Sequence, residues 1–468
     1  MKARSSKIVA GLIVLGLAAA ACSEEETGTT TEAPAASEST AGSDTTAAAD
    51  TTVAGDTTPA TDPADGEANA WALDYTGGTA GAASGDPIVI GYVNQESFFP
   101  ESTLGLNAAV EYVNAELGGA AGRPIEVVEC FIAVAEDGAR CGIEMANNPD
   151  VTIVLTGTTG LGNKELYDSL QGKKPVIIGN GIAVDDFTTT AGVGFTTASP
   201  GTIPGLAGFI AQYLPDVKSV AMLASSAAGG QSTAELLVKP VTDKADIDLT
   251  FVGIDDTATA AGVQSSLQAA GADQVDALLV LVSVQQCINV YDSLGAMGID
   301  PVVVTTGLCY GTPMTDHLSD LGVDSQVPDG WYFGGYGYSY FIPDYESGMV
   351  TYLEKVHQYG EPVSGSDTLE YTGFAGPTFA NVMTLAKLIN QLGEDNLDYA
   401  SLDSAIRGFT GPMMLQAGPL DCGNQTILGL SLFVSVCGKL MGVEQYKDGE
   451  WIPIAMELNG KAIDATTL

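Results

Sequence analysis

Positively charged residues are scarce in this chain of 468 residues. It contains 17 Lys and Arg against 58 Asp and Glu, which gives a formal net charge of −41. Nucleic-acid binding needs clustered Lys and Arg to displace counterions from the phosphates, so this balance argues strongly against DNA or RNA as a partner. It argues equally against a peripheral domain held on anionic lipid by charge.

Histidine is also nearly absent. His317 and His357 are the only two, and neither belongs to an HExxH motif or to a closely spaced His/Cys set. Zinc ligation and a His-based catalytic triad both need such sets. We therefore expect no metal, no cofactor and no enzymatic activity.

A hydrophobic run long enough to span a bilayer is missing at the N-terminus. The apolar segment Ile8–Leu17 falls short of the roughly 20 residues that a membrane span needs. Basic residues precede it and a run of alanines ending at Cys22 follows it, which is the layout of an export signal. A cysteine in this place resembles a bacterial lipobox, in which the thiol is acylated. Residues 1–22 are therefore predicted to be a lipoprotein signal peptide. An ordinary secretory signal with an incidental cysteine is the alternative.

The next segment lacks what a folded core needs. From Ser23 to Ala70 the chain has one Val and no Leu, Ile, Met, Phe, Tyr or Trp. Such a composition cannot bury enough apolar surface to offset the entropy of ordering. No Lys or Arg occurs between Lys7 and Arg123, so the acids repel one another and extend the chain. We predict that residues 23–86 are a disordered tether.

Cysteine usage points to an oxidising compartment. Apart from Cys22 the chain has an even set: Cys130, Cys141, Cys287, Cys309, Cys422 and Cys437. An even number in an exported chain favours disulfides, and no CxxC spacing suggests metal ligation. Several connectivities are possible. Closing each neighbouring pair costs the least chain entropy, so we predict Cys130–Cys141, Cys287–Cys309 and Cys422–Cys437.

From residue 87 onward, short runs of β-branched residues alternate with amphipathic helical patterns. Strands are predicted at 87–94, 125–128, 151–155, 175–179, 219–224, 249–253, 277–282 and 301–306. Helices are predicted around 106–117, 140–146, 164–170, 202–214, 235–244, 261–270, 344–359 and 378–392. This α/β alternation implies parallel sheets covered by helices on both faces. Residues 431–436 and 443–454 are predicted to be antiparallel strands, the latter turning at Asp448-Gly449.

Between Pro87 and Ile454 the sequence resembles the solute-binding proteins of branched-chain amino acid and amide ABC importers, which have the type I periplasmic-binding fold. The most specific stretch is 105–127, GLNAAVEYVNAELGGAAGRPIEV, which looks like the family's first helix and its turn into the second strand. Four shorter segments resemble, in order, a crossover, a late helix, a further crossover and the closing hairpin: 195–205, 371–381, 409–412 and 445–451.

The resemblance implies two doubly wound parallel-sheet lobes joined by three crossovers, near Ala198, Asp300 and Gly411. Lobe one would hold 87–198 and 301–410, and lobe two would hold 199–300 and 411–468. The ligand would lie between the lobes at the carboxyl ends of strands, as is usual in open α/β sheets. The lobes would close around it by a hinge motion.

Two loops of lobe one are implied to bind the ligand. Thr158 and Thr159 follow a strand and precede a helix, so their hydroxyls and exposed amides suit a carboxylate or another acceptor-rich group. The family uses this loop in that way, and simple helix capping by Thr is the alternative. Asn180, Ile182 and Ala183 follow the next strand and line the same cleft in the family.

Two positions in lobe two depart from relatives that bind α-amino acids. Where those relatives carry an aromatic residue, this chain has Ser225, and where they place an acid for the ammonium group, the nearest match is Gln286. An amide cannot supply the charge that a desolvated ammonium prefers. A branched-chain amino acid is therefore disfavoured, while amides, urea-like molecules, aromatic acids and other small polar solutes remain open.

Aromatic residues supply further candidates for the cleft walls. Phe98, Phe99 and the run Trp331–Tyr340 offer rings for stacking, although a strand with core-facing aromatics would equally explain most of the run. Leu308 and Tyr310 flank Cys309 in a loop after a predicted strand. A local disulfide would hold both at the cleft.

We therefore predict a monomeric, lipid-anchored, extracytoplasmic solute-binding protein that passes a small polar molecule to an ABC permease. A ligand sensor of the same fold that docks on a membrane receptor is an alternative that the sequence does not separate. A secreted hydrolase is less well supported, because the chain has neither a GxSxG elbow nor a His paired with a nucleophile.

Overall fold

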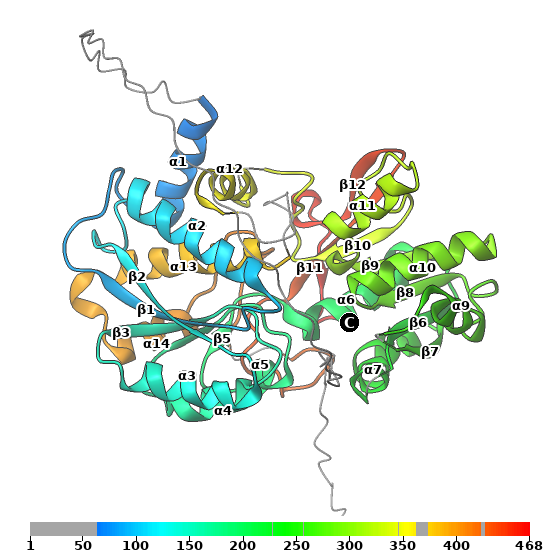
Figure 1. Cartoon of the computed structure of the whole chain (residues 1–468), viewed down its shortest axis with the longest axis horizontal. Coiled ribbons are helices and arrows are strands. Elements are labelled where there is room, and N and C mark those ends of the chain that lie inside the picture. The colour runs from blue at the N-terminus through cyan, green and yellow to red at the C-terminus, as the bar shows by residue number, and fades with distance from the viewer. Residues whose placement is uncertain (1–62, 227, 256, 345, 362–372, 423–425) are drawn as a thin grey trace, which may run out of the picture.

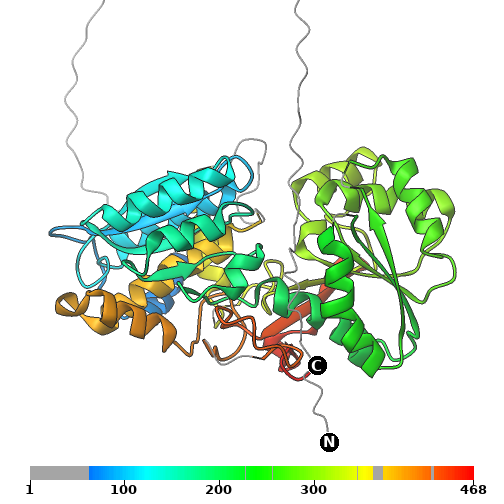
Figure 2. The same ribbon diagram turned by 90° about the horizontal axis from the view of Figure 1, so that it is seen from below.

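The computed structural model describes residues 63–226, 228–255, 257–344, 346–361, 373–422 and 426–468. In these ranges the chain forms two α/β lobes joined by segments that pass between them (Figures 1 and 2). This arrangement confirms the predicted fold class. The predicted signal peptide, the lipidation site Cys22 and the predicted tether up to residue 62 lie outside the described residues.

Lobe one, on the left of Figure 1, is built on a five-stranded parallel sheet in the order β2-β1-β3-β4-β5. Its strands are β1 Ile88–Asn94, β2 Ile125–Phe131, β3 Val151–Thr156, β4 Val176–Ile178 and β5 Val193–Gly194. Its helices are α2 Pro100–Glu116, α3 Ala135–Asn147, α4 Asn163–Leu170, α5 Val184–Thr188, α12 Met349–Tyr359, α13 Ala375–Leu392 and α14 Tyr399–Arg407. A short 3-10 turn, η3 Glu394–Asn396, joins the last two.

The strands of lobe one are apolar throughout because helices cover both faces of the sheet. Ile88, Ile90 and Tyr92 of β1 pack in the cluster that includes α2, α12 and α13. Val89 and Val93 of the same strand point the other way, into the cluster formed with α3 and α4. Alternate side chains of an extended strand face opposite sides, so a strand between two helical layers must be apolar at every position.

Lobe two contains an eight-stranded sheet in the order β12-β11-β10-β9-β8-β6-β7, with β13 paired to β11. Its strands are β6 Ser219–Ser225, β7 Asp248–Ile254, β8 Ala277–Leu281, β9 Val302–Thr306, β10 Tyr332–Gly335, β11 Leu440–Lys447, β12 Glu450–Ala455 and β13 Ile463–Asp464. The strands from β7 to β10 are parallel, whereas β11 runs antiparallel to its neighbours β10, β12 and β13.

Helices cover both faces of this sheet as well. They are α6 Ala198–Tyr213, α7 Ala228–Thr233, α8 Lys239–Lys244, α9 Ala260–Ala269, α10 Val284–Met297 and α11 Thr312–Asp320, with the shorter turns η1 Ala234–Val238, η2 Gly307–Cys309 and η4 Glu457–Asn459. α9, α10 and α11 share one apolar cluster with the sheet, and α6, η1 and α8 share the other.

The C-terminal hairpin confirms the predicted turn. β11 and β12 are antiparallel and joined at Asp448 and Gly449, whose φ values are 54° and 85°. Positive φ at both central residues is what a type I′ turn requires. The strand predicted at 431–436 is wrong, because only an isolated bridge between Gly194 and Val436 forms there. This segment instead packs Phe433 and Val436 into a small apolar cluster with Phe187 of lobe one.

The predicted lobe boundary at residue 300 is wrong. β9 pairs with β8 and β10 pairs with β9, so both strands belong to lobe two. The chain crosses into lobe one only between β10 and α12, and it returns between α14 and β11. Sequence pattern does not reveal which sheet a strand joins, because that choice depends on partners distant in sequence.

The prediction that the tether continues to residue 86 is also wrong. Residues 63–76 form helix α1, which packs against α12 and α13 (Figure 1). Tyr75 is buried there, and its hydroxyl lies 2.8 Å from Oγ1 of Thr384, while Nζ of Lys387 lies 4.2 Å from its ring centre. Trp71 stacks on Tyr75. These rings follow directly after Ala70, where the stretch without large apolar residues ends.

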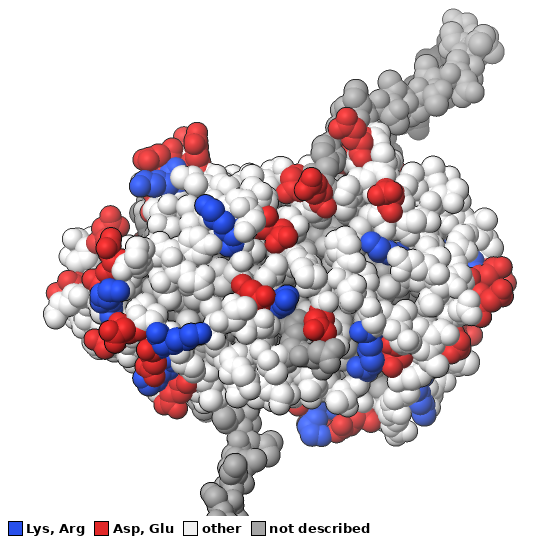
Figure 3. All heavy atoms as spheres, turned by 180° about the vertical axis from the view of Figure 1, so that it is seen from behind, with Lys and Arg blue, Asp and Glu red and all other residues white. Residues whose placement is uncertain are grey.

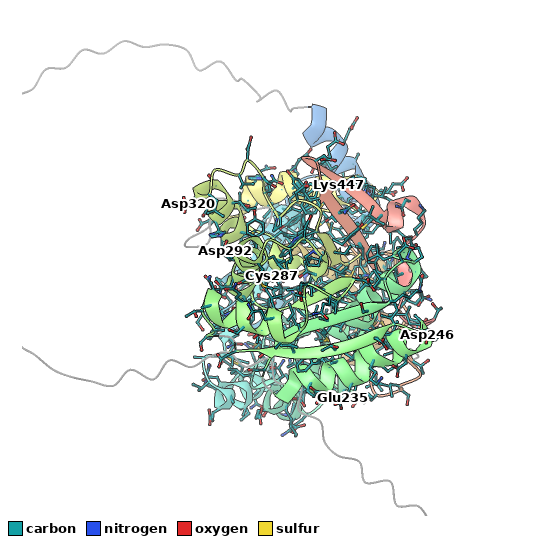
Figure 4. The ribbon with its side chains drawn as sticks, turned by 90° about the vertical axis from the view of Figure 1, so that its right-hand side faces the viewer. Glu235, Asp246, Cys287, Asp292, Asp320 and Lys447 are labelled. Carbon is teal, nitrogen blue, oxygen red and sulfur yellow. A yellow bond between two sulfur atoms is a disulfide. The ribbon has the colours of Figure 1, made fainter. Side chains whose placement is uncertain are left out.

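The three predicted disulfides are confirmed. Cys130–Cys141 links β2 to α3, Cys287–Cys309 links α10 to η2, and Cys422–Cys437 closes part of the segment that returns to lobe two. The Cα–Cα distances of 5.6, 5.5 and 4.2 Å lie in or close to the range of ordinary disulfides. In Figure 4, Cys287 lies in the body of lobe two, whereas Glu235, Asp246 and Asp320 lie at its periphery.

Candidate ligand-binding cleft

A cleft of about 690 Å³ lies between the two lobes. Lobe one contributes Phe98, Ile182 and Phe374 to its lining, and lobe two contributes Ser225 and Thr306 among others. Several of these positions follow the carboxyl ends of strands: Phe98 after β1, Ile182 after β4 and Leu308 after β9. Open α/β sheets place their ligands at this end of the strands, and the volume suits a small molecule.

Half of the predicted site residues line this cleft. They are Phe98, Ile182, Ser225, Leu308 and Tyr310. Phe98 and Leu308 are half exposed, at 51% and 50%, so their side chains stand at the rim. Tyr310 is better packed, with its ring centre 5.7 Å from that of Phe333 and 5.4 Å from that of Phe341. Cys309, which lies between Leu308 and Tyr310 in the chain, is bonded to Cys287, as predicted. This disulfide attaches the loop to α10.

Thr158 and Thr159 do not reach the cleft lining, and their predicted exposure is wrong. Both are buried. Oγ1 of Thr158 lies 2.8 Å from Oγ of Ser102, and its N–H donates to Oδ1 of Asn94. Oγ1 of Thr159 accepts from Nδ2 of Asn163 at 2.8 Å. The polar groups of this loop are therefore bonded to other groups of lobe one.

Asn180 and Ala183 also bond to groups of lobe one, although Oδ1 of Asn180 has no hydrogen-bond partner among the described residues. Nδ2 of Asn180 donates to Oγ1 of Thr378 at 3.0 Å, and the N–H of Ala183 donates to Oδ2 of Asp186 at 3.1 Å. Burial raises the pKa of Asp186 to about 6, although its hydrogen bonds act in the opposite direction. Neither Asn180 nor Ala183 lines the cleft, while Ile182 between them does.

Gln286 is also placed away from the cleft. It is buried on α10, where Nε2 donates to the carbonyl of Ala258 at 3.1 Å and Oε1 accepts from Nδ2 of Asn289 at 3.0 Å. These hydrogen bonds lie within lobe two, and the contact of Gln286 with the ligand stays a prediction. No helix is predicted over 284–297, so the sequence did not show which face of α10 points into the lobe.

Aromatic rings form much of the cleft wall. The run Trp331–Tyr340, predicted either to stack on a ligand or to fill a core, is divided between the core of lobe two and the cleft lining. Trp331 is buried in the core of lobe two. Phe333, Tyr336, Tyr338 and Tyr340 line the cleft. Further apolar lining residues were not predicted: Phe187, Met222, Met349, Phe374, Leu415, Phe433 and Met456.

Two carboxylates line the cleft, and neither was predicted. Glu101 lies in the first turn of α2, and Glu444 lies on β11. Burial raises the pKa of Glu101 above its usual value, and it raises the pKa of Glu444 to about 8. Among the described residues that line the cleft there is no Lys, Arg or His. The sequence did contain a signal for Glu444. It is an acidic residue within the largely apolar run of a strand that is buried on both faces.

The wider surface gives no sign of a basic partner site on the face that Figure 3 displays. Its Lys and Arg side chains are interspersed with Asp and Glu and are separated by large areas of other residues. Among the described residues, no group of three or more His, Cys, Asp and Glu side chains is placed to hold a metal ion. None of the described helices is long and apolar enough to cross a membrane.

Comparison with known proteins points in one direction. A sequence model of the family described as periplasmic binding protein matches residues 93–427. A leucine-binding protein from Thermotoga maritima is similar in structure, with a TM-score of 0.59 and 11% identity over 81% of this chain and 100% of that one. No match is found among proteins of curated function.

Two ligand complexes are also similar in structure. One is an ABC transporter substrate-binding protein from Desulfitobacterium hafniense in complex with Leu, with a TM-score of 0.57 and 15% identity over 79% of this chain and 100% of that one. The other is a solute-binding protein from Rhodopseudomonas palustris in complex with 3,4-dihydroxybenzoic acid, with a TM-score of 0.59 and 17% identity over 82% of this chain and 98% of that one. At these identities the likeness concerns the fold.

Proposed function

Because this chain belongs to the periplasmic binding protein family, we propose that it is the solute-binding component of an ABC importer, capturing a small molecule between its lobes for delivery to a membrane permease. The observation that carries this proposal is the cleft itself. It is lined from both lobes and lies at the carboxyl ends of their strands. A molecule held there touches both lobes at once, so its binding free energy favours the closed arrangement.

Closure would occur at the segments that join the lobes. They lie between β5 and α6, between β10 and α12, and between α14 and β11. A few residues in such connections absorb the backbone rotation of a hinge while each lobe moves as a rigid body. The permease would then distinguish the loaded from the empty protein by the relative position of the two lobes.

The lining favours a solute with a ring or a compact apolar body. Tyr336, Tyr338 and Phe374 are partly exposed in the cleft lining, and aromatic rings bind other rings by offset stacking or edge contacts. The sequence left amino acids, amides, urea-like molecules and aromatic acids open. The aromatic lining favours solutes with an apolar part over small, wholly polar molecules such as urea.

Lipid anchoring on Cys22 remains part of the proposal. It rests on the export signal that precedes this cysteine and places the protein on the outer face of the cell membrane. Helix α1 adds a feature to it, because the tether would enter the folded part on lobe one, beside α12 and α13. Lobe one would then be held near the membrane, and lobe two would be the lobe that moves.

A thermal-shift screen tests solute binding directly. Amino acids, amides, ureas, amines and aromatic acids would each be added to the purified protein. A ligand at 100 times its dissociation constant should add roughly 2.7 kcal/mol to the free energy of unfolding. Hits would be confirmed by titration calorimetry. A screen in which no small molecule of any class binds would contradict the proposed function.

A blocking variant tests whether the solute occupies the cleft. Gly335 lines the cleft, and a Cβ added there meets no heavy atom within 4 Å, so Gly335→Leu should fill the cleft while the fold is kept. Gly295→Leu is the matched control, because Gly295 is exposed on α10 and its Cβ would also meet nothing. We expect binding to be lost in the first variant and kept in the second. Equal binding by both would place the solute elsewhere.

A further inference from the structure

Glu444 is a buried acid in the lining of the cleft. Its side chain is only 5% exposed, and it lies opposite Phe333 in the antiparallel pair of β11 and β10. Residues directly opposite each other in such a pair point to the same face of the sheet. Glu444 and Phe333 both line the cleft, so the carboxyl group and the ring belong to one continuous wall.

This carboxyl group has only part of the hydrogen bonding that a buried acid needs. The side chain of Ser339 donates one hydrogen bond to it. Oε2 has no hydrogen-bond partner among the described residues, and Glu444 takes part in none of the ion pairs found among them. A buried polar atom without a partner costs free energy that folding must supply from elsewhere. An atom left in this state at a ligand cleft indicates that the ligand supplies its partner.

Aromatic residues line the same cleft as the acid. Burial is the main cause that raises the pKa of the Tyr310 hydroxyl, and Tyr340, Glu444 and Tyr336 lie close enough to raise it further. Tyr340 reaches toward lobe one, where its ring centre lies 5.8 Å from that of Tyr352 on α12. The faces of such rings carry negative electrostatic potential and attract cations. The acid and its aromatic surroundings therefore favour the same kind of group.

Resting on the proposed solute-binding function, we propose that Glu444 recognises a positively charged group on the ligand, an ammonium on an aliphatic or aromatic body. The ammonium would bond to Oε2 of Glu444 and lie against the faces of Tyr310, Tyr336 and Tyr340. The apolar body would extend along Phe333 toward Phe374 of lobe one. The ligand class is thus a small organic cation.

The charge distribution disfavours the other ligand classes. A carboxylate in this cleft would face Glu101 and Glu444 and would find no Lys, Arg or His among the described lining residues. The segment 362–372, which precedes lining residue Gly373, has no basic residue in its sequence either. A buried anion that finds no cation to pair with costs free energy, and such a penalty is one way in which a site rejects the wrong ligand. With a neutral solute, Oε2 of Glu444 would either bond to a donor group of that solute or remain unpaired.

Binding of a cation should be linked to loss of a proton. Burial raises the pKa of Glu444 to about 8, so the empty protein holds this carboxyl group protonated at pH 7. An adjacent cation stabilises the ionised form and lowers the pKa. Tyr310, Tyr336 and Tyr340, which line the same cleft, all have pKa values that burial raises, and they stay neutral in this range. Cation binding at pH 7 should therefore release a proton, and affinity should rise toward pH 8.

The test uses sets of solutes that differ only in head-group charge. One set is phenethylammonium, 2-phenylethanol and 3-phenylpropanoate, and two further sets carry the same head groups on butyl and indolylethyl bodies. Calorimetry with the full-length protein should show a cation binding at least about tenfold more tightly than its neutral and anionic counterparts. A neutral or anionic member that binds as tightly as the cation, or the absence of binding by every cation, overturns the inference.

Two variants assign the preference to Glu444. In Glu444→Gln the cation should fall to within about threefold of its neutral counterpart, whose affinity should stay nearly unchanged. Glu450→Gln is the matched control, because it removes one negative charge from an exposed position on the neighbouring strand β12, and it should keep the full preference. Glu444→Gln binding with unchanged charge preference would also overturn the inference.

Proton release gives a measurement that needs no variant. Titration of the wild-type protein in two buffers with different ionisation enthalpies should show net release of a proton when a cation binds at pH 7, and equal heats in both buffers would count against the role of Glu444. Failure of the inference can be told from failure of the proposed function. If a neutral or anionic solute binds and Gly335→Leu abolishes that binding, the solute-binding function stands and only the cation assignment falls.

Discussion

The loop after β3 and the middle of β11 are both buried polar sites near the cleft, yet they differ in what remains for a ligand. In the loop, the hydroxyls of Thr158 and Thr159 pair with Ser102 and Asn163. On β11, Glu444 keeps one oxygen without a partner among the described residues. Polar residue type and position at a strand end are thus poor guides to a binding site. What distinguishes Glu444 is that its residue lines the cleft, whereas Asn163 and Asn180, whose Oδ1 atoms also lack a partner among the described residues, do not line it.

The largest expected effect is on how the unfolding free energy depends on pH, which should distinguish the Glu444 site from the Thr158 loop. The pKa of Glu444 is about 8 when folded, above its value in the unfolded chain, so its protonated form favours folding. Its contribution is complete at low pH and is lost as pH rises toward and through 8. Relative to Glu444→Gln, the wild type should lose up to about 4 kcal/mol of unfolding free energy between pH 5 and pH 9. Urea unfolding without ligand at both pH values measures this difference.

Glu450→Gln serves as the control for that measurement, since Glu450 is exposed and should show little change of the difference with pH. If Glu444→Gln and the wild type follow parallel pH profiles, the acid is not buried in the way described, and the contrast with the Thr158 loop disappears.

The next effect concerns the wall beside the acid. Cys287–Cys309 closes a loop of 22 residues and holds Tyr310 next to it in the chain. Replacing both cysteines by Ser should lower the unfolding free energy by about 3 kcal/mol, mainly because the unfolded chain gains entropy. Ligand affinity should fall as well, because the wall is less well ordered before binding. Denaturation together with calorimetry measures both.

The disulfide Cys130–Cys141 provides the comparison, because it joins β2 to α3 and neither cysteine lines the cleft. Its removal should lower stability and leave the affinity of the refolded protein unchanged. The same loss of affinity in both double variants would show that the Cys287–Cys309 bridge has no special role at the cleft.

A smaller effect is expected in the loop of lobe one. Thr158→Val removes the hydroxyl bonded to Ser102 and leaves a buried partner unsatisfied, so the unfolding free energy should fall by about 1–3 kcal/mol. Affinity for the ligand should not change, because the hydroxyl faces the interior of lobe one. Loss of affinity without loss of stability would restore this loop as part of the binding site.

The smallest effect on stability is expected at the rim. Phe98 is half exposed, so Phe98→Ala should change the unfolding free energy by less than about 0.5 kcal/mol. The ring nevertheless lines the cleft, and its loss should weaken binding of any solute with an apolar body. Thermal unfolding and calorimetry on one preparation compare the two quantities, and unchanged affinity would mean that the ligand lies deeper.

Local pattern predicted the secondary structure of this protein well. The apolar runs at 88–94, 151–156 and 277–281 became strands because they are mainly apolar on both faces, and each lies between two helical layers. The Asp448-Gly449 turn and the three local disulfides were equally accessible. In each case the residues that determine the outcome lie within a few positions of one another or close a short loop.

Helix α1 shows where composition alone fails. The absence of large apolar residues up to Ala70 predicts disorder, and that prediction extends to residue 86. Trp71 and Tyr75 nevertheless provide enough apolar surface for a helix to dock on α12 and α13. The helix is stable because of surfaces formed by residues far along the chain, and a local window does not contain them.

Most strands and helices, the hairpin and the disulfides follow from the sequence alone, because these depend on side-chain periodicity, turn residues and short loop closures. The folded structure was needed to show that β9 and β10 join lobe two, that Thr158 and Gln286 bond within their own lobes, and that Glu444 lines the cleft. Each of these outcomes depends on contacts between segments distant in sequence. Such contacts decide which polar groups are already paired within the protein and which remain available to a ligand.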